Sequence, residues 1–340
     1  MPALYLTEQQ TKIRIRNRRL RVERETDSGS TGRPEVLLSV PLHHVEQVVL
    51  FGNIGLTTPA IAALLERGCE VVFLTRHGEY RGRLVGAFTP HVPLRRAQYR
   101  ALEDAEFPLA MAAHFVRAKL LHQKALLLRN SRPARSERVA QAVAILDRAL
   151  ENLPRKRAIS SLRGLEGSAT AAYFGGLRTF FDPQWRFLGR NRRPPRDPVN
   201  VLLSLGYTLL TQVALAAVQT VGLDPYAGFL HEVVYNRPAL ALDLVEEFRP
   251  VVDGLALWLC RSGVLTPQDF LTGTPERPIL LSDEGRRRFL RAWEERLETK
   301  FTHPVRQQRL PLRQCLIEQA RQIARAVQQG KAVYTPMGFR

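Results

Sequence analysis

The sequence has little cysteine: three residues in 340, at positions 69, 260 and 315. Cysteines so few and so widely separated indicate neither a disulfide framework nor a cysteine-rich zinc site. We therefore expect reduced, buried thiols and a cytoplasmic protein. We also expect no secretory signal peptide, because Lys12 and an arginine-rich stretch follow closely on the N-terminus. The sequence shows no internal repeat and no low-complexity tract.

Acidic residues are scarce relative to basic ones. There are 32 Asp and Glu against 50 Lys and Arg, so the net charge is +18 and the sequence pI is near 10.7. Such a charge attracts polyanions, either nucleic acid or an anionic membrane surface. Most of the basic residues are arginines, whose guanidinium groups bind phosphate in a bidentate manner. Nucleic acid is therefore the favoured partner, and a basic protein without such a partner is the alternative.

Long uncharged stretches are also rare, and one of them is a candidate membrane span. It runs from Pro198 to Leu223 without a charged residue. A polar side chain nevertheless recurs on almost every turn, and a lipid-facing helix would have to bury these groups unpaired. The stretch is therefore predicted to be a buried helix of a helical domain, and no membrane partner is expected.

The N-terminal residues 1–85 are predicted to form a β-domain. Residues 12–16 and 20–23 alternate between apolar and charged side chains, and Asn17-Arg18 supplies a turn between them. Further strands are predicted at 36–40, 48–51, 70–74 and 80–85. A short helix is predicted after Thr57, because Pro59 suits a first helical turn and Gly68 can end the helix.

Residues 86–105 are predicted to be a linker, since they contain Pro90, Pro93 and the pair Arg95-Arg96. After this segment the apolar period becomes helical, and residues 106–340 are predicted to form a larger, all-α-helical catalytic domain. The fold class is therefore α+β. The expected helices cover residues 109–129, 139–150, 161–174, 199–221, 239–258, 284–301 and 310–329. Residues 310–340, which are net basic, could contact a partner or DNA, or form a frayed terminus.

A local excess of carboxylates lies next to a histidine in residues 201–250. This block holds five acidic residues against two arginines and includes His231. Carboxylates beside a histidine in a basic chain suit a metal site for phosphate chemistry. Asp243 shares a helix face with Glu246 at i,i+3 and with Glu247 at i,i+4. The alternative is a solvated acidic face beside a histidine that has a purely structural role.

A second acidic candidate is Glu166, in the stretch Leu165 to Thr170. It precedes small, uncharged residues that allow close helix packing. Such packing would place Glu166 in an interior crevice, where a carboxylate needs a cation. The alternative is a glutamate near a helix N-terminus that is stabilised by the helix dipole.

Taken together, these segments resemble the CRISPR-associated Cas1 family, the integrases of spacer acquisition, over essentially the whole chain. The N-terminal part carries Leu4-Tyr5-Leu6, Phe51-Gly52-Asn53, Thr57-Thr58-Pro59, Val72-Phe73-Leu74 and Gly78-Glu79-Tyr80-Arg81-Gly82. The helical part carries Leu165-Glu166-Gly167 with Tyr173, the run from Arg192 to Asn200, Leu203 to Tyr207, Gly222 to Tyr226, Gly228 to His231 and Leu240 to Pro250. Each motif alone is weak, whereas their order and spacing are specific.

The resemblance implies a set of metal ligands. The family uses a Glu, a His and a Glu or Asp, which match Glu166, His231 and Glu246. The third ligand lies three residues after Asp243, which selects Glu246 over Glu247. The implied ion is Mg²⁺ or Mn²⁺. The resemblance also implies a homodimer formed through the β-domain, a dimer of the small Cas2 protein as partner, and double-stranded DNA, both prespacer and CRISPR repeat, as substrate.

The implied reaction is transesterification, in which 3′-hydroxyl ends of new spacer DNA are joined to the repeat. Asp243, Asn200 and Tyr207 are predicted as auxiliary residues of the site. Arg192, Arg193 and Arg237 are predicted to bind the DNA backbone, whereas Arg249 is expected to brace its helix.

Three rival functions stay open at this point. A metal-dependent, structure-selective nuclease acting in repair would need the same site, because the residues do not distinguish water from a 3′-hydroxyl as nucleophile. The second rival is a non-catalytic DNA-binding module, and the third is a membrane protein.

Overall fold

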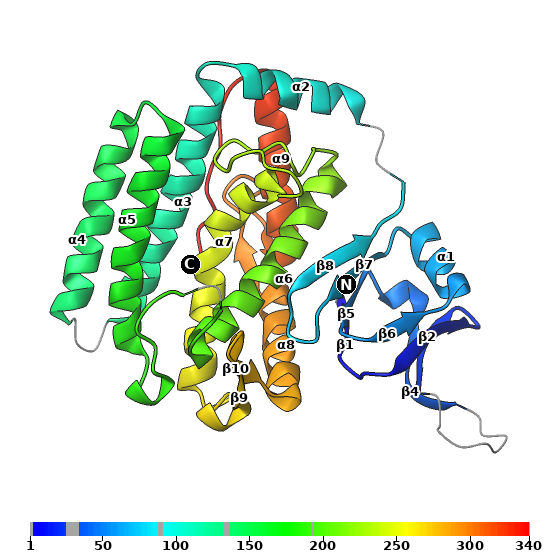
Figure 1. Cartoon of the computed structure of the whole chain (residues 1–340). Helices are drawn as coiled ribbons and strands as arrows, with labels where there is room; N and C mark the ends of the chain where they lie inside the picture. The colour runs from blue at the N-terminus through cyan, green and yellow to red at the C-terminus, as the bar shows by residue number, and fades with distance from the viewer. Residues whose placement is uncertain (1–2, 25–33, 88–90, 132–135, 192–193, 340) are drawn as a thin grey trace. The chain divides into compact units, whose positions relative to one another are not determined.

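The computed structural model describes the chain except for residues 1–2, 25–33, 88–90, 132–135, 192–193 and 340. The chain divides into two compact units, Met1–Phe88 and Thr89–Arg340. In Figure 1 the first unit is blue to cyan, and the second continues from cyan to red. The first unit is rich in strands and the second in helices, which is the α+β arrangement expected from the sequence.

The described part of the first unit contains two four-stranded sheets and a helix. One sheet has the order β1-β5-β7-β8 and the other β4-β3-β2-β6. In the first sheet, β1, β5 and β7 are parallel and β8 is antiparallel. Their bounds are β1 Ala3–Leu6, β2 Thr11–Arg16, β3 Arg19–Arg24, β4 Glu35–Pro41, β5 Gln47–Phe51, β6 Ile54–Leu56, β7 Glu70–Leu74 and β8 Tyr80–Leu84, with α1 at Thr58–Glu66 and a 3-10 turn at Leu42–His44.

The alternating pattern of the first unit produces its core. Ile13 of β2 and Leu20 of β3 are buried together with Val48 of β5 and Leu64 of α1. The hairpin between β2 and β3 turns at Asn17 and Arg18, whose φ angles are 52° and 55°. Two positive φ angles suit the tight turn of a twisted hairpin. The predicted turn is therefore confirmed. The short strands β1 and β6 had not been predicted.

The described part of the second unit is dominated by long helices. Helices α3, α4 and α5 lie side by side, and α7 packs against α3 and α6 (Figure 1). The helix bounds are α2 Val92–Glu103, α3 Phe107–Asn130, α4 Glu137–Asn152, α5 Ile159–Leu177, α6 Pro198–Val221, α7 Ala239–Arg261, α8 Asp283–Glu298 and α9 Leu312–Gln329. Shorter 3-10 turns lie at Leu153–Arg155, Arg178–Phe180, Pro183–Trp185 and Pro267–Asp269.

The second unit is not purely helical. Two antiparallel hairpins occur in it, β9 Phe270–Thr274 with β10 Arg277–Leu281, and β11 Lys300–Thr302 with β12 Arg309–Pro311. The helix predicted to end at Phe301 ends earlier, at Glu298, and Phe301 lies in β11. The predicted linker 86–105 contains helix α2. Pro93 occupies the first turn of that helix, where the missing N–H of proline costs nothing.

Helix α6 is the uncharged stretch that had been considered as a membrane span. By length and composition it is apolar enough to cross a membrane, yet most of its most apolar window is buried inside the protein. Asp197 caps its N-terminus by accepting a hydrogen bond from the Asn200 backbone N–H, and Gly222, with φ at 95°, ends it. Burial against α7 and α9 accounts for its apolar composition.

Candidate metal centre

A pocket of about 260 Å³ brings the three predicted ligands together. Glu166 comes from α5, His231 from the loop between α6 and α7, and Glu246 from α7. The other lining residues are Arg163, Leu230, Glu232 and Arg237. Three elements that are distant in sequence thus meet at one site, and one of the arginines predicted to bind DNA lies at its edge.

Asp243 fixes the position of His231. The Asp243 carboxylate lies one turn before Glu246 on α7 and is fully buried. It accepts hydrogen bonds from the backbone N–H groups of Phe229, Leu230 and His231 at 2.6, 2.9 and 2.9 Å. A fourth contact, 2.7 Å from Oδ1, joins it to the His231 Nδ1 atom. Because a carboxylate can only accept, Nδ1 carries a proton, which leaves Nε2 as the ring nitrogen that faces the pocket side of Glu246. Asp243 is therefore an orienting group.

Lys119 of α3 lies between two of the predicted ligands. Its ammonium group is 2.6 Å from Glu246 Oε2 and also donates to Glu166. Glu166 additionally accepts a hydrogen bond from Thr170 at 2.9 Å. This lysine was not predicted as a site residue, because in the sequence it is one of several basic residues along α3, such as Arg117 and Lys124. Its burial results from partners on α5 and α7, which no local pattern reveals.

Glu246 is held in its ionised form. Burial alone would raise the pKa of its carboxyl group, but Arg249, Lys119 and His231 together hold that pKa well below its usual range. Arg249 Nε donates to Glu246 Oε1 at 2.8 Å. The His231 Nε2 atom lies 3.8 Å from the same oxygen. The carboxylate is therefore available as an anionic ligand at any physiological pH, and Arg249 braces it.

A buried tyrosine–aspartate cluster lies behind Arg249. The Arg249 guanidinium lies over the Tyr207 ring, 4.6 Å from its centre. Tyr207 and Tyr173 both donate hydroxyl hydrogen bonds to Asp253. Burial raises the pKa of Asp253 to about 6, although the two hydroxyl groups and Arg249 oppose that rise. Tyr207, predicted to line the site, thus acts one layer behind it.

Asn200 is placed elsewhere. It is fully buried at the start of α6, where its side chain donates to the Gly189 carbonyl and accepts from the Arg190 side chain and the Asn191 backbone. It is not among the residues that line the pocket. Its amide oxygen and nitrogen are both hydrogen-bonded to residues 189–191. Asn200 therefore holds the segment before α6 in place and has no role in the pocket. The predicted DNA contacts Arg192 and Arg193 lie outside the described residues.

Glu247, the neighbour of Glu246, faces away from this pocket. It is fully buried and accepts hydrogen bonds from Gln319, Tyr334 and the Met337 backbone N–H. Burial raises the pKa of its carboxyl group. The segment after α9, which had been expected to be a frayed terminus or to contact a partner, is thereby tied to α7.

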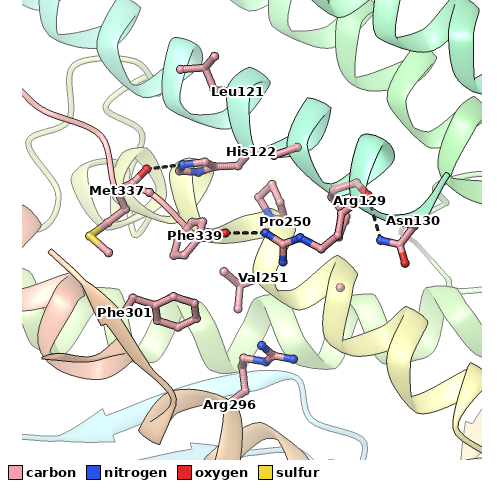
Figure 2. Close-up of a pocket in the computed structure, with 14 residues that line it drawn as sticks. Leu121, His122, Arg129, Asn130, Pro250, Val251, Arg296, Phe301, Met337 and Phe339 are labelled. Carbon is pink, nitrogen blue, oxygen red and sulfur yellow. Dashed lines mark hydrogen bonds between the residues drawn. The ribbon is translucent and has the colours of Figure 1, made fainter. Parts of the chain in front are cut away.

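The same C-terminal segment walls a second pocket of about 430 Å³, which Figure 2 shows. In this view Met337 and Phe339 face residues of α3 and α7. The His122 Nε2 atom lies 2.6 Å from the Met337 carbonyl oxygen, and Arg129 donates to the Phe339 carbonyl at 2.5 Å. No lining residue is common to the two pockets.

The donors at the first pocket fit a hard divalent ion in kind. Two carboxylates and an imidazole nitrogen are ligands that Mg²⁺ or Mn²⁺ accepts. Within the described residues, no three acidic, histidine or cysteine side chains form a preformed metal cluster. In this arrangement Lys119 supplies the positive charge between Glu166 and Glu246. The chemistry of the donors supports a metal site, and the lysine is the group with which an ion would compete.

Comparison with known proteins adds a family match. The family model described as "CRISPR associated protein Cas1" matches residues 4–295. A curated relative, the CRISPR-associated endonuclease Cas1 1 of Thermus thermophilus, is 41% identical over 98% of this chain and 98% of its own length.

Two solved structures share the fold. A casposase bound to its integration product has a TM-score of 0.86 at 24% identity, with 98% of this chain and 92% of that chain covered. A Cas6-RT-Cas1–Cas2 complex has a TM-score of 0.83 at 28% identity, with 99% of this chain and 36% of that chain covered. The likeness to the casposase shows the fold alone.

Proposed function

This chain belongs to the CRISPR-associated Cas1 family, and from that premise we propose that Glu166, His231 and Glu246 hold the divalent ion of its phosphodiester chemistry. The protein is a DNA endonuclease and integrase of CRISPR adaptation. The observation that carries the site is the convergence of these three side chains on one pocket, with Asp243 holding the imidazole in the ligand tautomer. The repair-nuclease alternative is not favoured, because the relatives are CRISPR-associated endonucleases.

The proposed ion is Mg²⁺ or Mn²⁺, which when bound would polarise a phosphodiester and offset the charge that develops on it. The chain's own groups prepare the site. Arg249 keeps Glu246 ionised, and Asp243 holds His231 in place. Arg237, at the pocket edge, is suited to bind a DNA phosphate. The reaction proposed is attack of a DNA 3′-hydroxyl on a phosphodiester of the repeat, with release of another 3′-hydroxyl.

The proposed partners follow from the family. Double-stranded DNA is the substrate, and a net charge of +18 supports it. Cas2 is the protein partner, since a neighbour of known structure is a Cas1–Cas2 complex. A homodimer formed through the β-domain and a cytoplasmic location are further parts of the proposal. The three cysteines, all free and buried, are compatible with that location.

A strand-joining assay tests the proposal. The protein with Cas2 receives Mn²⁺, a labelled duplex with free 3′-hydroxyls and a plasmid that carries the repeat. We expect label to join the plasmid with wild type and not with His231→Ala. His44→Ala is the matched control, because His44 is an exposed histidine outside the pocket. Nicking without joining would support the nuclease instead, and equal joining by wild type and His231→Ala would refute the assigned site.

A further inference from the structure

The chain between His231 and Pro238 leaves the catalytic pocket, turns and returns to it. Glu232 and Arg237, near its two ends, both line the pocket. Between them the Arg237 backbone N–H donates to the Val234 carbonyl at 3.0 Å, and Asn236 has a φ of 60°. These features define a tight turn. Tyr235 and Asn236 are the central residues of the turn, and we call the three apolar residues Val233, Val234 and Tyr235, which lead into it, the tip.

The tip is apolar and open to solvent. Tyr235 is 99% exposed, and Val233 and Val234 are 68% and 48% exposed. Single exposed apolar residues are ordinary, whereas three in succession beside a reaction site indicate a contact that the isolated chain does not make. Among the described residues, no other large hydrophobic side chain is as exposed as Tyr235.

Resting on the proposed function, we propose that this tip contacts the target DNA and that Tyr235 stacks on a base unstacked beside the attacked phosphodiester. The pocket must hold that phosphodiester for the reaction to occur. Four residues beyond His231, the Tyr235 backbone is at most about 14 Å away along an extended chain. Duplex DNA with a phosphate in the pocket therefore passes within reach of the tip.

The charges around the turn fit DNA as its occupant. Arg237 presents a guanidinium at the base of the turn. The neighbouring carboxylate of Glu232 is paired with Arg163, so it does not repel phosphate as a free anion. Apolar side chains that enter between base steps open and kink a duplex, and aromatic rings stabilise the freed base by stacking. A tip of two valines and a tyrosine has both capacities.

The role assigned to Tyr235 is positioning. Tyr235 is almost fully exposed and is not among the residues that line the pocket, and its role is to stabilise the opened target that brings the phosphodiester into the pocket. Stacking of one base on an aromatic side chain corresponds to about 5- to 150-fold in binding. Tyr235→Ala is therefore expected to lower joining to an intact duplex by about fivefold or more, whereas Tyr235→Phe retains the ring and stays near wild type.

The experiment compares Tyr235→Ala, Tyr235→Phe and wild type, each with Cas2, in the joining assay. Tyr226→Ala is the matched control, because Tyr226 is a half-exposed tyrosine outside the turn. Two repeat targets are used, one fully paired and one with mismatches flanking the attacked phosphodiester. We expect the defect of Tyr235→Ala on the paired target to shrink several-fold on the mismatched one, since unstacking has already occurred there. Loss of the stacked ring removes no charge, so the salt dependence of target binding should not change.

Other outcomes would overturn the inference. Equal joining by Tyr235→Ala and wild type would show that the tip does not act on DNA. An equal defect on both targets would show that base unstacking is not its role. A weaker affinity for Cas2 with unchanged target binding would assign the tip to the protein partner. Failure of wild type itself to join DNA would instead refute the proposed function, which keeps the two failures distinct.

Discussion

The ammonium group of Lys119 lies 2.6 Å from Glu246 Oε2, and the same nitrogen contacts Glu166. A lysine on α3 thus holds together two carboxylates from α5 and α7 that are predicted to bind a metal ion. Both Lys119 and Glu246 are almost completely buried. The site therefore has an internal cation that offsets the negative charge of the two carboxylates. A metal ion bound there would add positive charge to the same two groups.

Replacing Lys119 should make the stability of the protein depend on metal. Without metal, Lys119→Met leaves Glu246 compensated only by Arg249 and His231. We expect a loss on the order of 3 kcal/mol, the low end for breaking a buried ion pair, because Arg249 remains. Saturating Mn²⁺ should recover more stability in this variant than in wild type. Urea unfolding with EDTA and with Mn²⁺ measures both.

The control for that experiment is Lys124→Met on the same helix. Lys124 pairs with Asp147 in a partly exposed position, so its loss should cost about 0–1 kcal/mol with or without metal. If Mn²⁺ raised the unfolding free energy of Lys119→Met and of wild type equally, Lys119 and the metal ion would not compensate the same carboxylates.

Asp243→Asn should impair the site while leaving its ligands in place. The amide cannot accept from three backbone N–H groups and also keep His231 in its Nδ1-protonated form. Removal of such an orienting carboxylate typically lowers metal affinity or activity by about 10- to 100-fold. Calorimetric titration with Mn²⁺ and the joining rate should both report this loss. Asp147→Asn, on the surface of α4, is the control, and comparable loss in it would reject the orienting role.

The buried acid Asp253 predicts an unusual pH dependence. Its pKa in the folded protein is about 6 against an ordinary value of 3.8, so the folded protein holds this proton to a higher pH than the unfolded chain does. Stability from this group is therefore present below about pH 4 and is lost as pH rises to about 6. The loss should be roughly 3 kcal/mol for a shift of this size.

Asp253→Asn isolates this contribution. Both proteins share every other titrating group, so the pH dependence of the difference between their unfolding free energies comes from Asp253. As pH rises from 4 to 6, wild type should lose stability relative to Asp253→Asn, and above pH 6 the difference should be constant. Denaturant unfolding at stepped pH measures it. A difference independent of pH would mean that Asp253 is ionised throughout that window.

The C-terminal segment should contribute measurably to stability through one hydroxyl group. Tyr334→Phe removes a donor to the buried Glu247 carboxylate, and such a loss costs about 1–3 kcal/mol. Guanidinium unfolding checks the value. Val333→Ala, next to it and exposed, should change stability by about 0.5 kcal/mol or less. If both variants behaved alike, the segment would not be anchored through Tyr334.

Arg237→Ala should weaken DNA binding without dependence on sequence. Loss of one phosphate contact reduces the slope of log K against log salt by about one unit. Fluorescence anisotropy over a salt series, with random and repeat duplexes, measures this slope. Arg100→Ala, on α2, serves as the control, and an unchanged slope in Arg237→Ala would remove this residue from the DNA contacts.

The sequence was informative where local pattern determines structure. Alternation predicted β2 and β3, and the Asn17-Arg18 turn between them. The uncharged run with regular polar side chains predicted a buried α6. Glu166, His231 and Glu246, the ligands implied by resemblance, line one pocket, and their role as ligands stays a prediction.

What the sequence did not reveal depends on contacts between distant elements. Lys119 is separated by 47 and 127 residues from the carboxylates that surround it, so its spacing on α3 matches that of an ordinary basic face. Asn200 and Tyr207 were assigned to the pocket because they are polar in an apolar helix. Each is instead satisfied by a nearer partner, Asn200 at the start of α6 and Tyr207 at Asp253. The anchoring of Tyr334 likewise depends on Glu247, 87 residues earlier.

Glu246 and Glu247 are consecutive residues, yet Glu246 lines the candidate metal pocket and Glu247 holds the C-terminal segment. In genetic terms, a nonsense change at the codon for Val333 would delete no predicted ligand but would leave Glu247 without Tyr334 and Met337. Such an allele is expected to lower the stability of the protein although every predicted ligand is still encoded. Screens that seek inactive alleles only among the codons for the predicted ligands would overlook it.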